Sequence, residues 1–158
     1  MTNVIRPARP GDAARLKAVC TDCGLFAAEE LSYVHADIDA WTTGETSRQW
    51  LLADRDGDHG AAMVAPEEMS DNVWNMLFLG VAASGQRRGI GRALLAAVES
   101  MVRDRSGRLL LIDTASTEDF TPARTLYASA GYRQEAVIRE YYGDGIDRVT
   151  FAKRLAVG

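Results

Sequence analysis

The chain contains few of the residues that bind metals or form disulfides. Of its 158 residues, only two are cysteine and two are histidine. Cys20 and Cys23 lie within one helical pattern, in the stretch C-T-D-C, whereas His35 and His59 lie in unrelated segments. A structural zinc site needs four ligands, and a redox-active cysteine pair is typical of a strand-to-helix turn. We therefore expect two ordinary thiols and no metal site.

Long apolar segments are also absent. No run of about 18 apolar residues, the length that crosses a bilayer, occurs in the sequence. The first residues, MTNVIRPARPGD, lack the apolar stretch of a signal peptide. These absences predict a cytoplasmic protein that does not bind a membrane.

An excess of positive charge is missing as well. The 18 basic and 22 acidic residues give a formal net charge of -4, which argues against a nucleic acid as the main partner. The hydrophobic content of 47% is ordinary for a globular protein, and the length is sufficient for one buried core. No linker, repeat or low-complexity segment divides the chain, so we expect a single domain over residues 1–158.

The hydrophobic pattern predicts strands and helices in the order β-α-α-β-β-β-α-β-α-β-β. The expected strands are residues 4–9, 48–54, 60–65, 70–82, 109–112, 136–142 and 147–155. The expected helices start after Asp12, at Ala28, at about Gly89 and after Thr121. The stretch DRDGDH from Asp54 contains acidic residues but lacks the glycine and glutamate spacing of a calcium loop, so we expect a hairpin turn at Asp56-Gly57.

Three local features of this pattern are specific enough to be checked. Asp12 and Thr121 are expected to cap their helices, with Pro122 as the first helical residue of the second one. The uninterrupted run at 109–112 is typical of a strand that is covered on both faces and paired in parallel. In the helix at 89–105, the period places Glu99 on the polar face, opposite an apolar face made of Ile90, Leu94, Ala97, Val98 and Met101.

The stretch VAASGQRRGIGR connects the fourth strand to this helix. Glycines at a helix start lower stability, but they allow a ligand to approach the backbone closely. The first turn of a helix has N–H groups without intrahelical partners and a partial positive charge, which favour an anion. A lone G-x-G is more often a tight turn without a ligand, so the neighbouring residues determine which interpretation applies.

Two motifs, in this order, resemble those of the GNAT superfamily of N-acetyltransferases. The first is a strand ending in Leu79-Gly80-Val81, followed by a Q-x-x-G-x-G turn made of Gln86, Arg87, Arg88, Gly89, Ile90 and Gly91. The second has the form A-x-x-L-Y-x-x-x-G-Y and consists of Ala123, Leu126, Tyr127, Gly131 and Tyr132. The resemblance spans nearly the whole chain. It implies an α/β (α+β) fold with a mixed, mostly antiparallel sheet of about seven strands, helices on both faces, and parallel fourth and fifth strands that splay apart.

The resemblance also implies a coenzyme site. In this family the pantetheine arm of acetyl-CoA lies between the splayed strands, and the diphosphate lies on the glycine turn. The implied binding residues are Leu79, Gly80, Val81, Gln86, Arg87, Arg88, Gly89, Ile90, Gly91 and Arg92. Phe120 replaces an asparagine that is frequent in the family, which puts one of the usual contacts with the pantetheine region in doubt.

For catalysis, the resemblance places the Val81 N–H at the thioester carbonyl and Tyr127 at the general-acid position. Asp113 is the candidate general base, although a strand-end aspartate that bonds to a turn is an equal interpretation. Glu29 and Glu30 are alternatives, as is an ordered water. Asn75 stands where some relatives have a glutamate, and it cannot take a proton.

The implied function is acetyl transfer from acetyl-CoA to a primary amine of a small molecule or peptide, by direct attack in a ternary complex. The C-terminal hairpin, with Tyr141 and Tyr142, resembles that of the ribosomal-protein and peptide N-terminal acetyltransferases. A non-catalytic acyl-CoA sensor is the alternative, and a homodimer is possible. A dinucleotide site is not expected, because the early G-x-G-x-x-G motif is missing.

Overall fold

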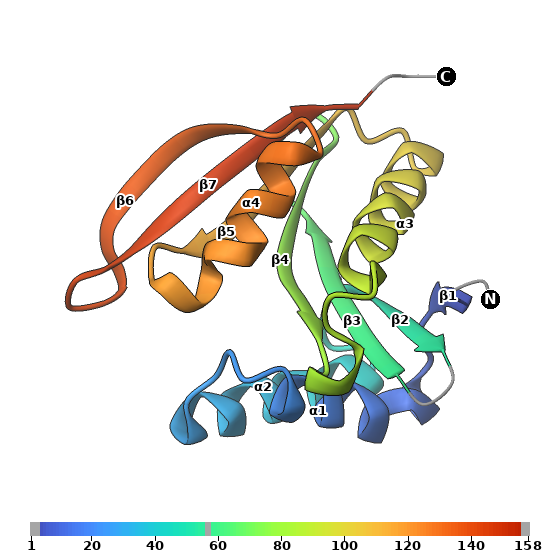
Figure 1. Cartoon of the computed structure of the whole chain (residues 1–158). Helices are drawn as coiled ribbons and strands as arrows, with labels where there is room; N and C mark the ends of the chain where they lie inside the picture. The colour runs from blue at the N-terminus through green and yellow to red at the C-terminus, as the bar shows by residue number, and fades with distance from the viewer. Residues whose placement is uncertain (1–3, 56–57, 156–158) are drawn as a thin grey trace.

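The computed structural model describes residues 4–55 and 58–155, and its strands form one seven-stranded sheet (Figure 1). The strand order is β1-β2-β3-β4-β5-β7-β6, and only β4 and β5 are paired in parallel. The strands are β1 Val4–Pro7, β2 Gln49–Arg55, β3 Asp58–Pro66, β4 Val73–Val81, β5 Leu109–Ala115, β6 Arg133–Gly143 and β7 Ile146–Arg154. The predicted mixed sheet is confirmed. The predicted turn at Asp56-Gly57 lies outside the described residues.

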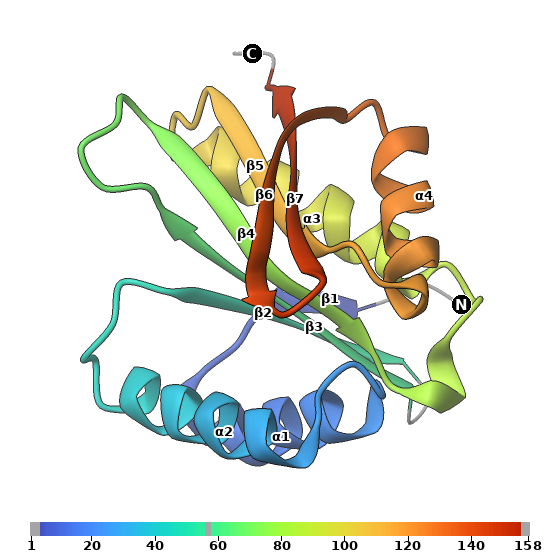
Figure 2. The ribbon, with the colours of Figure 1, turned by 90° about the vertical axis from the view of Figure 1, so that its left-hand side faces the viewer.

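Helices cover both faces of this sheet (Figures 1 and 2). Helices α1 (Ala13–Asp22) and α2 (Ala28–Thr42) lie on one face, while α3 (Ile90–Asp104) and α4 (Thr121–Ser129) lie on the other. Strand β2 contributes to the hydrophobic core on each face of the sheet. Trp50 and Leu52 pack in the core under α1 and α2, whereas Leu51 packs in the core under α3 and α4. This alternation follows from the two-residue period of a strand.

Glu99 differs from the prediction for α3. The apolar face of the helix is buried as expected, but Glu99 is buried with it and is only 9% exposed. Its Oε2 accepts hydrogen bonds from the Tyr132 hydroxyl at 2.6 Å and from Lys153 Nζ at 3.1 Å. The helical period cannot reveal these donors, because both come from residues that follow Glu99 in the chain by 33 and 54 positions.

The ends of two helices also differ in detail. The Asp12 side chain makes no hydrogen bond to the start of α1 and instead accepts one from the Arg9 N–H upstream. Thr121 is the first residue of α4 and Phe120 occupies the N-cap position, so Pro122 is the second helical residue. Both helices nevertheless begin within one residue of the predicted position, which is the usual uncertainty of a helix boundary.

Strand β5 is confirmed as the parallel partner of β4, but it is not fully covered on both faces. Leu110 and Ile112 are completely or almost completely buried. Leu109 and Leu111, which point to the opposite face, are only half-buried. The uninterrupted apolar run therefore predicted the parallel pairing correctly. It was wrong in predicting that the second face of the strand is also fully covered.

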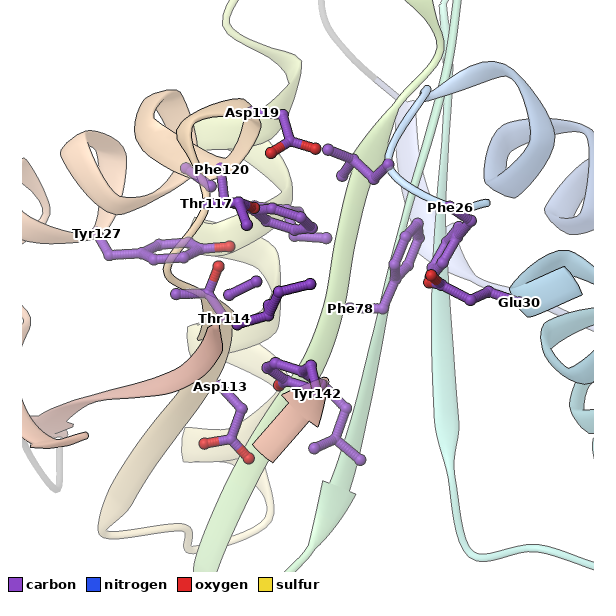
Figure 3. A pocket seen from close by; sticks show the side chains of 16 residues that line it. Phe26, Glu30, Phe78, Asp113, Thr114, Thr117, Asp119, Phe120, Tyr127 and Tyr142 are labelled. Atoms are coloured by element: carbon purple, nitrogen blue, oxygen red, sulfur yellow. The ribbon is translucent and has the colours of Figure 1, made fainter. Parts of the chain in front are cut away.

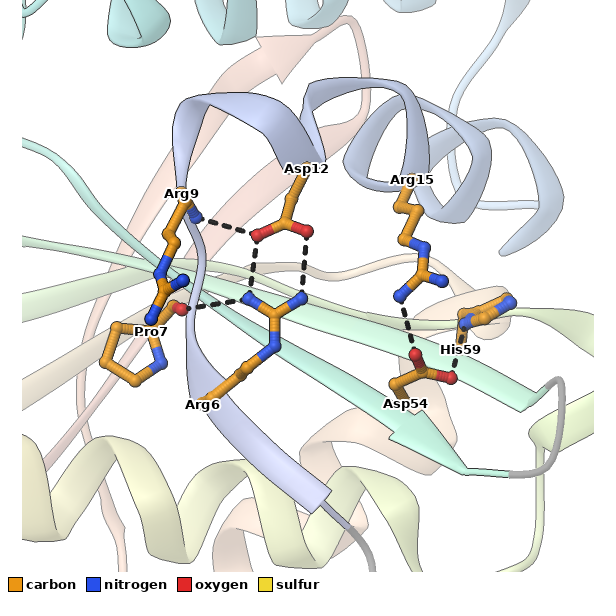
Figure 4. A network of polar contacts seen from close by, with 7 residues as sticks. All are labelled: Arg6, Pro7, Arg9, Asp12, Arg15, Asp54 and His59. Carbon is orange, nitrogen blue, oxygen red and sulfur yellow. Dashed lines mark hydrogen bonds and ion pairs between the residues drawn. The ribbon is translucent and has the colours of Figure 1, made fainter.

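An ion-pair network joins β1 to the start of α1 (Figure 4). The Arg6 guanidinium donates to both oxygens of Asp12, at 2.7 and 2.9 Å. Nearby, Arg15 of α1 donates to Asp54 of β2 at 2.6 Å, and His59 of β3 lies 3.6 Å from the same carboxylate. The Arg6–Asp12 ion pair is stronger than the Arg15–Asp54 ion pair, because a bidentate arginine–carboxylate pair forms two hydrogen bonds at once.

Asp12→Asn is expected to destabilise the fold by about 1 kcal/mol at neutral pH, because it removes the charge that Arg6 faces. Arg6 and the Arg9 N–H hold the pKa of Asp12 below its usual value of 3.8. A lowered pKa in the folded state means that this stabilisation is complete above about pH 4 and is lost as the pH falls further. Urea unfolding at pH 7 and pH 3 measures this difference. Asp39→Asn, in the exposed pair with Lys17, is the control and should have little effect at either pH.

Candidate functional site

The parallel strands β4 and β5 are paired over only four positions. Their register runs from Val73 opposite Leu109 to Met76 opposite Ile112, and no further pairs follow among the described residues. The register of β4 against β3 shifts at the same point, so that Leu77 is the extra residue of a β-bulge. Because a bulge bends its strand and increases the local twist, the two strands diverge beyond Met76.

A cleft of about 440 Å³ lies where the strands diverge (Figure 3). Its walls come from the start of α2 and the loop before it, from β4, from the end of β5, from the segment 114–127 and from the hairpin of β6 and β7. Three of the lining side chains are carboxylates, Glu30, Asp113 and Asp119, and none is Lys, Arg or His. Most of the other lining side chains are apolar, so the cleft combines an apolar lining with three carboxylates.

The backbone of β4 has no partner in β5 at Leu79, which lines this cleft, or at Val81, which follows it by two residues. The Ala82 N–H donates to the carbonyl of His59 on β3 at 2.8 Å. Hydrogen-bonded pairs alternate with non-bonded pairs in an antiparallel ladder, so Val81, which lies opposite Gly60, points its N–H and C=O away from β3. The same alternation applies to Leu79. Both residues therefore direct their N–H and C=O toward the side where β5 has separated, and of these four groups the Val81 carbonyl accepts a hydrogen bond from the Gln86 side chain.

The turn after β4 has an unusual backbone. A short 3-10 turn at Ala83–Gly85 is followed by Arg87 and Gly89, whose φ angles are 66° and 80°. The Gln86 side chain holds the turn against the strand by donating to the Val81 carbonyl at 3.0 Å. Helix α3 then begins at Ile90, and its first N–H groups lie at the end of this turn.

The other predicted residues of the turn have different surroundings. The Ile90 side chain is in the core and only 1% exposed, so only its backbone can contact a ligand. Arg92 donates to the Ser129 hydroxyl on α4 at 2.9 Å. A Cβ added to Gly91 would lie 3.6 Å from the Leu126 side chain, an ordinary contact, so the packing of the helices does not by itself require glycine there.

Tyr127 extends from α4 into the cleft, and its hydroxyl points toward β4 (Figure 3). The ring is 3% exposed and packs edge-on against Tyr132 and Phe151, with centroids 6.4 and 5.8 Å away. Burial raises the pKa of Tyr127 above its usual value of 10. The raised pKa keeps the hydroxyl protonated at neutral pH, and no described residue forms a hydrogen bond with it, so it can donate to a ligand.

The spacing between Tyr127 and Gly131 in the second motif has a structural reason. Gly131 has a φ angle of 92°, and its N–H donates to the Ala128 carbonyl while the Tyr132 N–H donates to the Tyr127 carbonyl at 3.0 Å. This pair of bonds is a Schellman motif, which ends α4 at a glycine. It fixes Tyr132 and Tyr127 relative to each other at the end of the same helix.

Asp113 lies at the edge of the cleft within a network of side-chain hydrogen bonds. Thr150 donates to its Oδ1 at 2.8 Å, and Asn75 donates to its Oδ2 at 2.9 Å. Asn75 also donates to Glu67 at 2.8 Å, and Arg148 Nε lies 3.9 Å from Asp113. The carboxylate is only 9% exposed, and both oxygens already accept a hydrogen bond.

Several residues of the site were not predicted from the sequence. Phe26, in the loop before α2, stacks on Phe78 of β4 with centroids 5.5 Å apart, and both line the cleft. Gly80 provides the space for the Phe78 ring, because a Cβ at that position would overlap the ring. A loop phenylalanine and a strand phenylalanine have no sequence signal that pairs them, so only the three-dimensional structure shows this contact.

The remaining candidates divide between the cleft and its surroundings. Glu30 lines the cleft, whereas Glu29 is not among the lining residues. Tyr142 also lines it, and burial, with a smaller effect of Asp113, raises the pKa of Tyr142 to about 12. Tyr141 instead lies under the Arg148 guanidinium, 4.4 Å from the ring centroid.

The two cysteines are free and buried, as expected of ordinary thiols. Burial raises the pKa of Cys20 to about 12, which makes the reactive thiolate rare at neutral pH. Within residues 4–55 and 58–155, no three His, Cys, Asp or Glu side chains are grouped so as to hold a metal ion. None of the described helices combines the length and apolarity needed to cross a membrane.

Comparison with known proteins gives the family. A family model described as an acetyltransferase (GNAT) domain matches residues 45–134, which is more than half of the chain. The chain belongs to the GNAT acetyltransferase family. The resemblance drawn from the two motifs is thereby confirmed, and this GNAT protein is an acyltransferase. Among curated proteins, the comparison found no match.

Solved structures share the GNAT fold over almost the whole chain. A Desulfovibrio desulfuricans protein assigned to the GNAT family is 29% identical, with a TM-score of 0.88 over 98% of this chain and 100% of that chain. The ribosomal-protein-alanine N-acetyltransferase from Brucella melitensis is 22% identical, with a TM-score of 0.73 over 96% and 99%. A Salmonella typhimurium acetyltransferase structure that contains its cofactor acetyl-CoA is 18% identical, with a TM-score of 0.75 over 99% and 95%.

Asp113→Asn is expected to destabilise this GNAT protein by about 1 to 3 kcal/mol. The new amide has one accepting oxygen in place of two, so the hydrogen bond from either Thr150 or Asn75 is lost or reversed, and the negative charge near Arg148 is removed. Denaturant unfolding at pH 7 measures the change. Asp119→Asn, which also alters a cleft carboxylate but breaks no hydrogen bond of the described residues, is the matched control. Equal stability of the two variants would contradict the role assigned to the network.

Proposed function

We propose that this protein transfers an acetyl group from acetyl-CoA to a primary amine by direct attack in a ternary complex. One observation supports this above all. The divergence of β4 and β5 leaves the backbone of Leu79, which lines the cleft, and of the nearby Val81 without a pairing partner in β5, and the Tyr127 hydroxyl enters the same cleft. A thioester bound along β4 would therefore meet backbone donors on one side and a proton donor on another.

For the coenzyme, the residues present fit the group that the family implies. The amides of the pantetheine arm would pair with the backbone of Leu79 and Val81, as an added strand does. The diphosphate would accept from the N–H groups of the turn from about Arg87 to Arg92, where the helix dipole favours negative charge. The side chains of Arg87, Arg88 and Arg92 would add positive charge beside it. Gly80, Gly89, Ile90 and Gly91 contribute backbone only.

The chemistry follows from these positions. The neutral amine nitrogen forms a bond to the thioester carbon, and the C–S bond breaks. The Val81 N–H would stabilise the negative charge that develops on the thioester oxygen. The Tyr127 hydroxyl would give its proton to the departing thiolate, and its raised pKa keeps the donor protonated at neutral pH.

We propose Asp113 as the acceptor of the amine proton. It lines the cleft and keeps unused lone pairs, because each of its oxygens accepts one hydrogen bond and can accept two. Glu30, on the opposite wall, is the alternative. If Asp113 is the base, the Asp113→Asn variant loses the acid limb of the pH–rate profile. If Glu30 is the base, Glu30→Gln loses it instead.

The acceptor is a primary amine of a small molecule or a peptide. The three carboxylates around the cleft, with no basic residue among its lining side chains, favour a ligand that arrives as a cation. A named relative acts on ribosomal-protein alanine, but at 22% identity it supports only the shared fold.

Calorimetric titration with acetyl-CoA, followed by thiol-release assays with amines and peptides, tests the proposed function. We expect binding of acetyl-CoA and thiol release that depends on an amine. Absence of binding would overturn the assignment of the cleft and turn. Binding without release to any amine would overturn the proposed reaction.

Gly89→Glu is expected to weaken acetyl-CoA binding by at least about 100-fold, because it places a carboxylate beside the diphosphate. Gly89→Gln is the matched control, since it has nearly the same size and the same strain at a φ angle of 80° but no charge. Calorimetry on both variants separates the two effects. Equal losses of affinity in the two variants would show that the charge plays no part.

Tyr127→Phe is expected to lower kcat by about 100-fold and leave the affinity for acetyl-CoA unchanged, because only the proton donor is removed. Stability should not fall, since the hydroxyl has no hydrogen-bond partner among the described residues. Burial raises the pKa of this group, so wild-type turnover should show no Tyr127-dependent loss below about pH 10. A variant with unaltered kcat would reduce Tyr127 to a packing role.

A further inference from the structure

A second cavity adjoins the cleft. It has a volume of about 300 Å³ and shares three lining residues with the cleft, Phe26, Leu77 and Phe78. The stacked rings of Phe26 and Phe78 therefore form a wall between the two spaces. Leu77 is the bulged residue of β4 and remains 39% exposed, although its side chain is apolar.

The walls of this cavity are apolar and carry no unpaired charge. Val34 from α2, Trp50 from β2 and Met63 from β3 line it away from the cleft. Its only charged lining residues, Asp37 and Arg48, form an ion pair with each other. A neutral apolar group would therefore enter this space without leaving either charge unpaired.

One further observation suggests that the cavity is completed by a ligand. Tyr33, also on the wall, is 78% exposed. Large side chains left exposed around an apolar hollow are typical of a binding site.

We propose that this cavity binds the apolar side group of the amine acceptor, so that the preferred substrate is a primary amine attached by a short linker to an aromatic or large aliphatic group. This inference rests on the proposed acetyl transfer in the adjoining cleft. Leu77 precedes Leu79 by two residues, about 7 Å of strand, so a short linker reaches from the cavity to the backbone that faces the coenzyme. The volume exceeds that of an apolar cavity that holds benzene, about 150 Å³.

Thiol release by the full chain with acetyl-CoA tests this inference with paired acceptors. The small-molecule pair is phenethylamine and ethanolamine, and the peptide pair is two tripeptides that begin with Phe or with Ser. We expect kcat/KM to be at least about tenfold higher for the apolar member of a pair, since a buried aromatic group adds that much binding. The pair with the larger rates shows whether the acceptor is a small molecule or a peptide.

Variants of the cavity wall then test whether the preference for apolar amines arises in the cavity. Val34→Phe reduces the volume of the cavity and should lower the ratio of phenethylamine to ethanolamine kcat/KM to near one, mainly through a higher KM for phenethylamine. Ala36→Phe adds the same ring to the same helix at an exposed position that does not line the cavity, and should leave the ratio unchanged. Tyr33→Ala removes an exposed wall without altering the core and should lower the ratio as well.

The possible outcomes distinguish a failure of this inference from a failure of the proposed acetyl transfer. Absence of thiol release with every amine would overturn the proposed acetyl transfer. Release with no preference for apolar amines, or a preference that Val34→Phe and Tyr33→Ala leave intact, would overturn the cavity assignment alone. Retained acetyl-CoA binding in calorimetry shows that each variant is folded, so a lowered ratio reports on the cavity.

Discussion

The short pairing of β4 with β5 is the constraint on which the rest of the site depends. Two parallel strands at the centre of a sheet normally stay hydrogen-bonded along their length, because unpaired backbone groups in an apolar environment cost free energy. Here the pairing stops after Met76 and Ile112, and the bulge at Leu77 turns β4 away. Backbone donors and acceptors are left for another molecule to satisfy, so the same defect that weakens the sheet creates the cleft.

Different interactions stabilise the two sides of the cleft. On the side of β4, the Gln86 side chain bonds to the Val81 carbonyl and holds the following turn. On the side of α4, Glu99, Tyr132 and Lys153 form a buried polar cluster that connects α3 with β7 and the end of α4. Lys153 also donates to the Ala130 carbonyl at the end of α4. Tyr127 is therefore positioned by a helix that is fixed at its C-terminal end, which orients the ring without a hydrogen bond to its hydroxyl.

The sequence was sufficient for the elements and for the two motifs. Strand and helix periods and the glycines at helix ends predicted the elements and their order, and one apolar run predicted the parallel pairing of β5. The mixed sheet was implied by the resemblance to the GNAT superfamily. The burial of Glu99 was not predicted, because its hydrogen-bond partners come from distant parts of the chain. A helical period describes only residues within the same helix. The stack of Phe26 on Phe78 was missed for the same reason. Asp113 was identified as a candidate, but its bonds to Asn75 and Thr150 depend on how three strands lie side by side.

Gly80 has a consequence for how this site could change over time. The glycine leaves space for the Phe78 ring, and that ring separates the cleft from the adjoining cavity. A methyl group at position 80 would displace the ring and reshape both spaces in one step. The strand proposed to bind the coenzyme and the wall proposed to bind the acceptor therefore depend on the same residue. A lineage of this protein could not adjust one substrate's site at that position independently of the other.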